Sequence, residues 1–267
     1  MINKDGNTAF ILGIPLFSSS RDVLLKRLEK VLSAKRRLSS KAILIFTPNP
    51  EMMVYAQRHP DFGRLLALNN YNIPDGAGLV IASRLLAALG RTEVGLGVQR
   101  IAGTDLMSDL LGLASEHGWR VFFLGGQADT AGNAAKMAAV RFPRLQIKAG
   151  SGPLRVEAAE ADENRHWVSQ INDFKTDILF VGFGHGKQEK WLKMYQDELK
   201  VKLAMGIGGA FDFLSGNVQR APLIWRRLGL EWLYRLLRQP WRLRRILDAV
   251  IVFPWLVLKQ ELSIRNS

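Results

Sequence analysis

Asp75 stands in a Pro-Asp-Gly turn between a short apolar strand, predicted at Tyr71–Ile73, and a helix predicted to start at Gly78. A carboxylate at the end of a strand can face a ligand cleft and act as a general base, taking the proton of an attacking hydroxyl. Aspartate is also among the best N-caps of helices, and one residue can satisfy both geometries. Position alone therefore leaves base and cap as two open interpretations of Asp75.

A hydroxyl and a carboxamide, those of Thr47 and Asn49, follow the buried strand predicted at Lys41–Phe46. Either side chain could orient a sugar or a phosphate. The alternative is ordinary turn chemistry, because Thr-Pro-Asn-Pro is rich in the residues that form turns.

Three glycine-rich turns also follow predicted strands. They contain Gly125 and Gly126, residues 182–186 and residues 206–209. Glycines let backbone N–H groups approach a phosphate closely, although they also permit tight strand-to-helix crossings. None of these turns is a P-loop or a dinucleotide fingerprint. After the second turn Lys187 could meet a phosphate and Gln188 a uracil or sugar hydroxyl, unless both simply open a solvated helix.

Metal and thiol chemistry are not signalled. The chain has no Cys, and its four His show no H-x-x-x-H spacing. No D-x-D follows an apolar strand, and there is no G-x-S-x-G nucleophile motif. We therefore predict no metal and no cofactor, and the absence of Cys fits an intracellular location.

Strand, small-residue turn and helix alternate at least five times over the first 216 residues. Helices are predicted over residues 21–35, 50–69, 78–89, 103–117, 129–141, 158–172 and 188–199. Strands are predicted over residues 41–46, 71–73, 119–124, 145–148, 177–181 and 201–205. Such alternation predicts an α/β fold, a mostly parallel sheet with helices on both faces. Ligand sites in these sheets lie beyond the carboxyl ends of the strands, where the residues named above fall.

The last fifty-one residues are different in kind. Asn217–Ser267 contains ten Lys or Arg against three Asp or Glu, and four of the seven Trp. Its period is helical, and we expect Pro240 to end or kink a first helix and Pro254 to interrupt a second. A basic, Trp-rich helical segment suits the anionic, partly apolar headgroup region of a bilayer.

The most apolar run, Ile246–Leu258, is shorter than the about 20 residues that a spanning helix needs, so we expect the tail to lie on a membrane rather than cross it. We predict two domains: a catalytic domain at 1–216 and a membrane-associating appendage at 217–267. Met1–Phe17 makes a poor signal peptide and fits a first strand or hairpin better.

Two other classes of protein remain as rivals. A sequence pI of about 10.3 also fits a nucleic-acid-binding protein, but the tail's Arg residues lie among Trp, Leu and Ile, and few residues are placed for base readout. The second rival is a non-catalytic membrane-surface module that binds a nucleotide or assembles other enzymes. Neither rival requires Thr47, Asn49, Asp75 and Gln188 at one rim, so we predict an enzyme without a nucleic-acid partner.

Eight short motifs, within a match that covers roughly residues 8 to 246, together resemble those of a known family. In chain order they are T-P-N-P-E from Thr47, P-D-G from Pro74, R-I-A-G-T-D-L from Arg100, F-L-G-G from Phe123, G-K-Q-E from Gly186, G-I-G-G-A-F-D from Gly206, G-N-V-Q-R-A-P from Gly216 and G-L-E-W-L-Y-R-L from Gly229. This set closely resembles the WecG/TagA/CpsF glycosyltransferases. The late pair of motifs is the most specific part of the match.

The resemblance implies an inverting, metal-independent transferase with a Rossmann-like core and a C-terminal appendage, which here is the basic, Trp-rich helical tail described above. Such enzymes move an N-acetylmannosamine-type sugar from UDP to an undecaprenyl-diphosphate-linked amino sugar. They work on the inner face of the cell membrane, in the synthesis of teichoic-acid linkage units, common antigen or exopolysaccharide. The resemblance leaves open the donor sugar, the acceptor, the polymer and a homo-oligomeric state.

The resemblance also implies roles for single residues. Asp75 matches the family's proposed base, and the substrate-binding positions match Thr47, Asn49, Arg100, Gly125, Gly126, Gln188, Arg235, Arg242 and Arg245. The last three would reach the pocket from the appendage and meet the diphosphate. One departure is Gly186, where the family usually has Pro before K-Q-E.

Overall fold

A computed structural model gives the fold, and it describes residues 8–35, 41–69, 71–90, 98–126, 129–153, 156, 161–219, 221–222, 224–225 and 231–265. The chain divides into two compact units, each discontinuous in sequence. The sheet unit comprises Arg21–Phe46 and Gly103–Val218, and the tail unit comprises Met1–Ser20, Thr47–Ala102 and Gln219–Ser267. The functional division at 216/217 is a different boundary from this one, and it stays a prediction.

Five strands of the sheet unit lie side by side, and each neighbouring pair is parallel. Their order is β3 (Ile43–Phe46), β8 (Leu203–Gly206), β7 (Ile178–Gly182), β5 (Arg120–Gly125) and β6 (Gln146–Gly150). The three central strands are buried along almost their whole length. Continuous apolar strands of this kind need cover on both faces.

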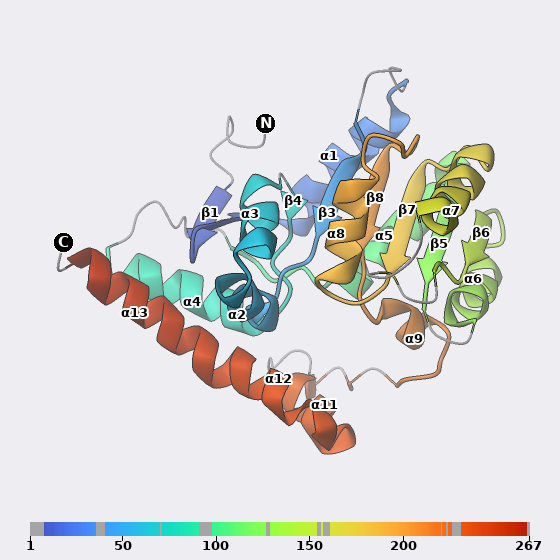
Figure 1. Cartoon of the computed structure of the whole chain (residues 1–267). Coiled ribbons are helices and arrows are strands. Elements are labelled where there is room, and N and C mark those ends of the chain that lie inside the picture. The colour runs from blue at the N-terminus through green and yellow to red at the C-terminus, as the bar shows by residue number, and fades with distance from the viewer. Residues whose placement is uncertain are drawn as a thin grey trace. The chain divides into compact units, whose positions relative to one another are not determined.

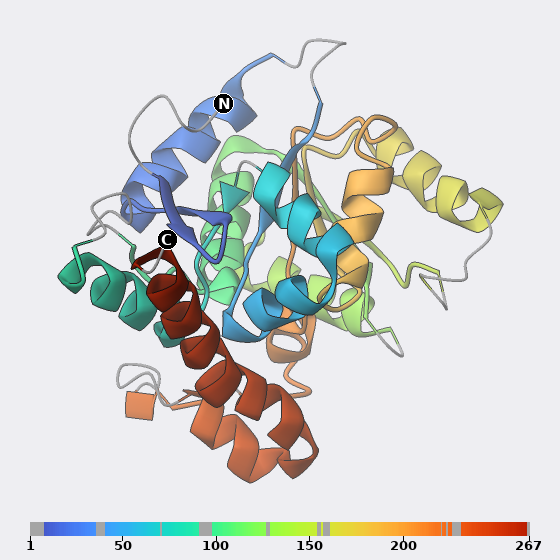
Figure 2. The same ribbon diagram turned by 60° about the vertical axis from the view of Figure 1, so that its left-hand side comes forward.

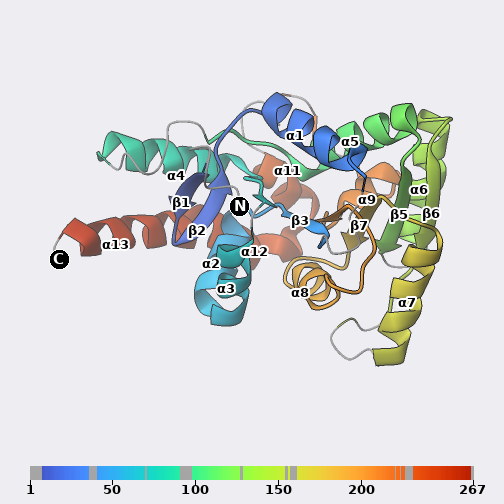
Figure 3. The same ribbon diagram turned by 90° about the horizontal axis from the view of Figure 1, so that it is seen from above.

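Helices supply that cover. They are α1 (Arg21–Ser33), α5 (Gly103–His117), α6 (Thr130–Arg141), α7 (Ala161–Asp173), α8 (Lys187–Met194) and α9 (Ala210–Leu214). Helices α1 and α5 lie on one face of the sheet, and α7 and α8 on the other (Figures 1 and 3). The predicted α/β fold, with a parallel sheet between helical layers, is confirmed.

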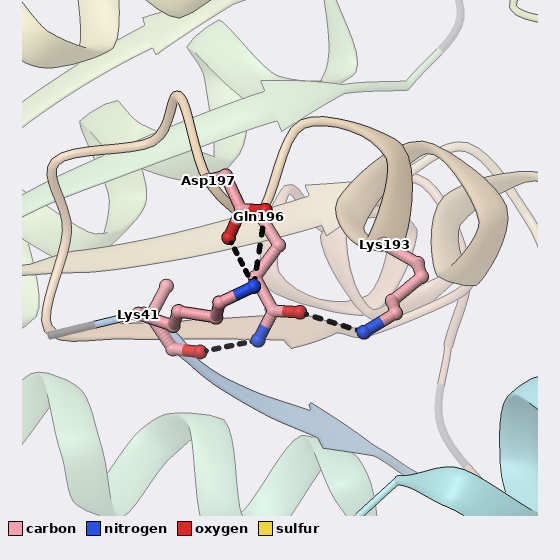
Figure 4. Close-up of polar contacts among 5 residues, drawn as sticks. Lys41, Lys193, Gln196 and Asp197 are labelled. Atoms are coloured by element: carbon pink, nitrogen blue, oxygen red, sulfur yellow. Dashed lines mark hydrogen bonds and ion pairs between the residues drawn. The ribbon is translucent and has the colours of Figure 1, made fainter.

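Helix α8 is shorter than its sequence pattern predicts, because it ends at Met194 rather than Leu199. Polar contacts hold the following turn against the start of β3 (Figure 4). The Gln196 amide donates to the Ala42 carbonyl at 2.8 Å and accepts from Lys193, while Lys41 pairs with Asp197 at 2.8 Å. These contacts accompany a turn at residues 195–198 in place of the last predicted helical turn.

The tail unit begins with the predicted hairpin, formed by the antiparallel strands β1 (Thr8–Ile11) and β2 (Ile14–Phe17). Its middle segment contains α2 (Pro50–Arg58), α3 (Pro60–Leu68), β4 (Tyr71–Asn72) and α4 (Ala77–Ala88). The single helix predicted over 50–69 is therefore wrong: it is two helices, divided at His59. Pro60 lacks a backbone N–H and disfavours helical angles at the residue before it, and His59 has φ −127° and ψ 90°.

The C-terminal segment is helical, as predicted. It comprises α11 (Glu231–Arg238), a 3₁₀ turn η2 (Pro240–Arg242), α12 (Leu243–Leu247), the π-helical turn η3 (Asp248–Val252) and α13 (Phe253–Arg265). Pro240 ends the first helix as expected, but the interruption expected at Pro254 is wrong. The Phe253 N–H donates to the Asp248 carbonyl five residues back, and this wider turn lets the helix continue through a proline (Figure 2). No helix within the described part of the chain is long and apolar enough to cross a membrane.

Candidate active site

Backbone hydrogen bonds bring three of the sequence motifs together in the tail unit. The Asp75 N–H donates to the Pro48 carbonyl at 2.9 Å, and the Ile101 N–H donates to the Pro74 carbonyl at 3.0 Å. The Pro-Asp-Gly turn therefore lies between the Thr-Pro-Asn-Pro turn and the segment that begins at Arg100.

Asp75 precedes the N-cap of α4, a position that Gly76 occupies with φ 116°. A Cβ built on Gly76 would lie 3.1 Å from Pro50, and one on Gly78 only 2.7 Å from it, so glycines let the two turns pack closely. The Asp75 Oδ1 lies 4.0 Å from the Arg100 Nε, and both side chains are half-buried. The assigned N-cap of α4 is thus one residue after Asp75, whose carboxylate pairs with a guanidinium in a partly accessible turn. Base and cap both stay predictions for Asp75.

Asn49 and Thr47 have different surroundings from those of a bare surface turn. Asn49 is the N-cap of α2, because its Oδ1 accepts the Met52 N–H at 2.9 Å. The turn chemistry considered for this residue is therefore present. Both side chains are half-buried beside the Asp75 turn, and their sugar-binding role stays a prediction.

The C-terminal segment reaches the same turns. The Arg245 Nε donates to the Glu51 Oε1 at 2.5 Å, in the first turn of α2. At the other end of α2, Arg58 donates to both carboxylate oxygens of Asp248 at 2.7 Å. Phe253 is buried and lies 4.0 Å from the Cβ position of Gly78.

Three arginines of the C-terminal segment are predicted to contact phosphate, and the structure describes the side chains of two of them. Arg245 is exposed and contacts Glu51, and Arg242 is half-buried in the preceding 3₁₀ turn. The Arg235 side chain lies outside the described residues, although its backbone belongs to α11. Glu51, which sequence reasoning did not select, is the partner that links Arg245 to the Thr-Pro-Asn-Pro-Glu motif.

In the sheet unit, the glycine turns stand at the point where the strand connections change direction. The chain passes from β5 to β6 on one side and then returns to β7 on the other side of β5. Ligands of open parallel sheets bind at this point, beyond the carboxyl ends of the two diverging strands. Gly125 ends β5, and the N–H of Gly126, the next residue, donates to the Gly182 carbonyl at the end of β7 at 3.2 Å.

Gln188 and Glu189 form a buried hydrogen-bond network beside these turns. The Gly208 N–H donates to the Gln188 Oε1 at 3.0 Å, and the Gln188 Nε2 donates to the Glu189 Oε1 at 2.7 Å. The Gly186 N–H donates to the other carboxyl oxygen of Glu189 at 2.7 Å. Gln188 is 2% and Glu189 0% exposed, so both polar groups of the Gln188 amide are used inside the protein. Its predicted contact with substrate stays a prediction.

Burial raises the pKa of Glu189 to about 7 from an ordinary value of 4.5, because the carboxylate is removed from water; its hydrogen bonds with Gln188 and Gly186 lower it less. Sequence reasoning missed this residue. The glycine N-cap followed by Glu at the third helical position is one half of a capping box, and that pattern was the available signal.

The raised pKa predicts a specific pH dependence of stability. Between about pH 4.5 and pH 7 the folded state binds more protons at Glu189 than the unfolded state does, so this group's stabilisation is present at low pH and is lost as the pH rises through about 7. We expect a loss of about 3 kcal/mol over that range. Urea unfolding at a series of pH values should show this slope in the wild type and lack it in Glu189→Gln. Parallel curves for the two proteins would contradict the prediction.

Metal coordination finds no support in the side chains that the structure describes. No group of three or more His, Asp or Glu there could hold a metal ion. The polar candidates are instead a carboxylate, guanidinium groups, a carboxamide and glycine turns, which suit sugar and phosphate groups.

A parallel α/β sheet with glycine turns at its switch point is the architecture of Rossmann-like proteins, whose ligands bind at that edge of the sheet. The chain matches the model of the glycosyl transferase WecG/TagA/CpsF family over residues 9–267. It therefore belongs to that family and is a glycosyltransferase.

Relatives of known activity cover nearly the whole chain. An N-acetylglucosaminyldiphosphoundecaprenol N-acetyl-beta-D-mannosaminyltransferase of Bacillus subtilis (strain 168) is 32% identical over 254 residues, which is 95% of this chain and 92% of that protein. A protein of the same name from Staphylococcus aureus (strain MRSA252) is 32% identical over 270 residues, covering 100% of this chain and 99% of that protein. The predicted resemblance to the WecG/TagA/CpsF family is confirmed.

Proposed function

We propose that this glycosyltransferase moves an N-acetylmannosamine-type sugar from a UDP-sugar to a polyprenyl-diphosphate-linked amino sugar, with inversion at the anomeric carbon and without a metal ion. The names of the relatives support this choice of sugar and acceptor. The observation that carries the proposal is the placement of Asp75. Its turn is bonded to the Thr-Pro-Asn-Pro turn, stands beside Arg100, and has the C-terminal segment packed near it.

In this proposal Asp75 is the general base. Its carboxylate takes the proton of the acceptor hydroxyl, whose oxygen attacks the anomeric carbon from the side opposite the diphosphate. The bond from the anomeric carbon to the diphosphate oxygen breaks, and the electron pair leaves with UDP. Thr47 and Asn49 orient the sugar from the neighbouring turn.

The departing UDP carries negative charge that must be stabilised. Arginine suits this role, because its planar guanidinium donates two parallel hydrogen bonds to a phosphate and keeps its charge. We assign this task to Arg242 and Arg245, with Arg235 as the third member, and the glycine turns at Gly125, Gly126 and residues 182–186 to the nucleotide.

The C-terminal segment also offers a surface for a membrane. One face of α13 is buried in the tail unit through Phe253, Val257 and Glu261. The opposite face and the turns before it expose large apolar side chains, namely Leu247, Ile251, Trp255, Leu258 and Leu262. Arg244 and Lys259 flank them, so the face fits an anionic bilayer at the inner side of the cell membrane, where the lipid acceptor is found.

Two aspartates on this face should release the protein from membranes. We expect Ile251→Asp with Trp255→Asp to weaken binding to vesicles of phosphatidylglycerol and phosphatidylethanolamine roughly a hundredfold, because each exposed apolar side chain loses its burial in the interface. Vesicle sedimentation measures the change. The matched control is Met137→Asp with Val140→Asp, two exposed apolar residues on α6 of the sheet unit. Equal binding by both double variants and the wild type would contradict this membrane face.

A UDP-release assay tests the proposed function. The protein is incubated with anionic vesicles, a polyprenyl-diphosphate N-acetylglucosamine acceptor, EDTA and a panel of UDP-sugars. Acceptor-dependent release of UDP with an N-acetylmannosamine-type donor is the expected result. Release only after addition of a divalent cation would overturn the metal-independent mechanism, and release only with another sugar would replace the donor.

A further inference from the structure

The buried network of Gln188 and Glu189 joins two loops that follow neighbouring strands. Strands β7 and β8 are paired in parallel, so the loops after them, residues 183–186 and 207–209, leave the same edge of the sheet unit. Glu189 holds the first loop through the Gly186 N–H, and Gln188 holds the second through the Gly208 N–H. We call these two side chains and their two backbone donors the loop bridge.

The loop bridge has a fixed direction of hydrogen bonding. Both of its ends are backbone N–H groups, which can only donate. Between them Gln188 accepts with its oxygen and donates with its nitrogen, and Glu189 accepts with both oxygens. A carboxylate at one position and an amide at the other is therefore the arrangement that satisfies every group.

The surrounding backbone is built for this bridge. A Cβ on Gly206 would lie 2.8 Å from the Gln188 Nε2, so only glycine lets the amide reach its place against β8. Gly186 and Gly208 have φ of 83° and 55°, in the left-handed region that favours glycine. A Cβ on Gly184 or Gly208 would meet nothing within 4 Å, so these two glycines permit the backbone conformation of the loops rather than close packing.

We propose that Glu189 is a positioning residue, which acts through Gln188 to hold the loops after β7 and β8 in the one conformation that binds the diphosphate of the donor nucleotide. This inference rests on the proposed function, because it takes a nucleoside diphosphate as the ligand. Backbone N–H groups bind phosphate only when their loop is held in a fixed shape, since ordering a mobile glycine loop costs conformational entropy.

Glu189→Gln is the first variant, because it keeps the size of the side chain and removes one acceptor. One donor then faces another donor, whichever way the two amides are turned, since both ends of the bridge are N–H groups. At about pH 8, where the Glu189 carboxyl is ionised in the wild type, we expect the Kd for UDP to rise about tenfold or more, with a parallel rise in donor KM and a smaller change in kcat. Calorimetric titration with UDP gives the Kd.

The exchanged double variant, Gln188→Glu with Glu189→Gln, is the decisive control. In it the carboxylate accepts from Gly208 and from the new amide, and that amide's oxygen accepts from Gly186, so all donors are satisfied again. We expect the Kd for UDP to return to within about threefold of the wild type. Exposed Glu198 provides the matched single control, Glu198→Gln, with unchanged binding.

Two results would overturn the inference, and a third would count against the proposed donor. A lower melting temperature in Glu189→Gln with an unchanged Kd for UDP would reduce the loop bridge to a structural role and overturn the proposal. If the single variant does not fold, an exchanged variant that folds but whose Kd for UDP stays about tenfold or more above that of the wild type would overturn it as well. No binding of UDP by the wild type would instead count against the proposed donor, which separates the two failures.

Discussion

Asp75→Asn is expected to lower kcat by about 10²- to 10⁴-fold, the loss typical of removing a general base. The amide keeps the size and polarity of the side chain but cannot take the proton of the acceptor hydroxyl. Donor KM should change little, because the base acts on the acceptor. Asp75 is half-buried in a turn, so the free energy of unfolding should stay within about 0.5 kcal/mol of the wild type.

The matched control for this variant is Asp61→Asn. Asp61 belongs to the same unit, in the first turn of α3, and its side chain is 84% exposed. Asp61→Asn removes the same charge at a far more exposed position, so kcat should not change. Steady-state UDP release with saturating acceptor measures both variants. An Asp75→Asn enzyme with more than about half the wild-type kcat would require a different base.

The fold follows from local patterns because the parallel sheet is built of repeated strand–turn–helix units. Each central strand is an apolar run ended by glycine, and the burial of β5, β7 and β8 matches those runs. Prolines show the limits of local rules. Pro60 divides a helix that periodicity alone continues, whereas Pro254 fits inside one because a π-helical turn precedes it.

The candidate site was less predictable than the fold. Asp75, Thr47 and Asn49 could be selected because turn residues after strands reach the ligand edge. The burial of Gln188 could not, since it depends on Gly208, twenty residues along the chain, and on the missing Cβ of Gly206. The link between Glu51 and Arg245 spans 194 residues, a separation at which single-sequence patterns carry no signal.

Arg245→Ala is expected to lower kcat/KM for the donor about a hundredfold, because one charge-assisted contact to the diphosphate is lost at the moment the charge develops. Glu51→Gln should have a smaller effect, about tenfold, since the Gln oxygen can still accept from the Arg245 Nε but no longer carries the charge that strengthens this hydrogen bond. Neither change should cost much stability. Arg245 is 46% exposed, and exposed ion pairs contribute at most about 1 kcal/mol.

Two ion pairs join α2 to the C-terminal segment. Variants of these pairs can separate the attachment of this segment to α2 from a direct role in catalysis. Arg58 and Asp248 form the second pair, in which the hydrogen bonds with Asp248 raise the pKa of Arg58 above its ordinary value. Exchange of this pair, Arg58→Asp with Asp248→Arg, should restore the activity that either single change lowers, because this pair only attaches the C-terminal segment to α2.

Exchange of the other pair, Glu51→Arg with Arg245→Glu, should restore attachment of the segment but not activity, since a carboxylate then stands where the diphosphate needs a guanidinium. Donor kcat/KM and vesicle binding, measured for all four single and both double variants, give the answer. Full activity in the Glu51/Arg245 exchange would show that Arg245 only attaches the tail.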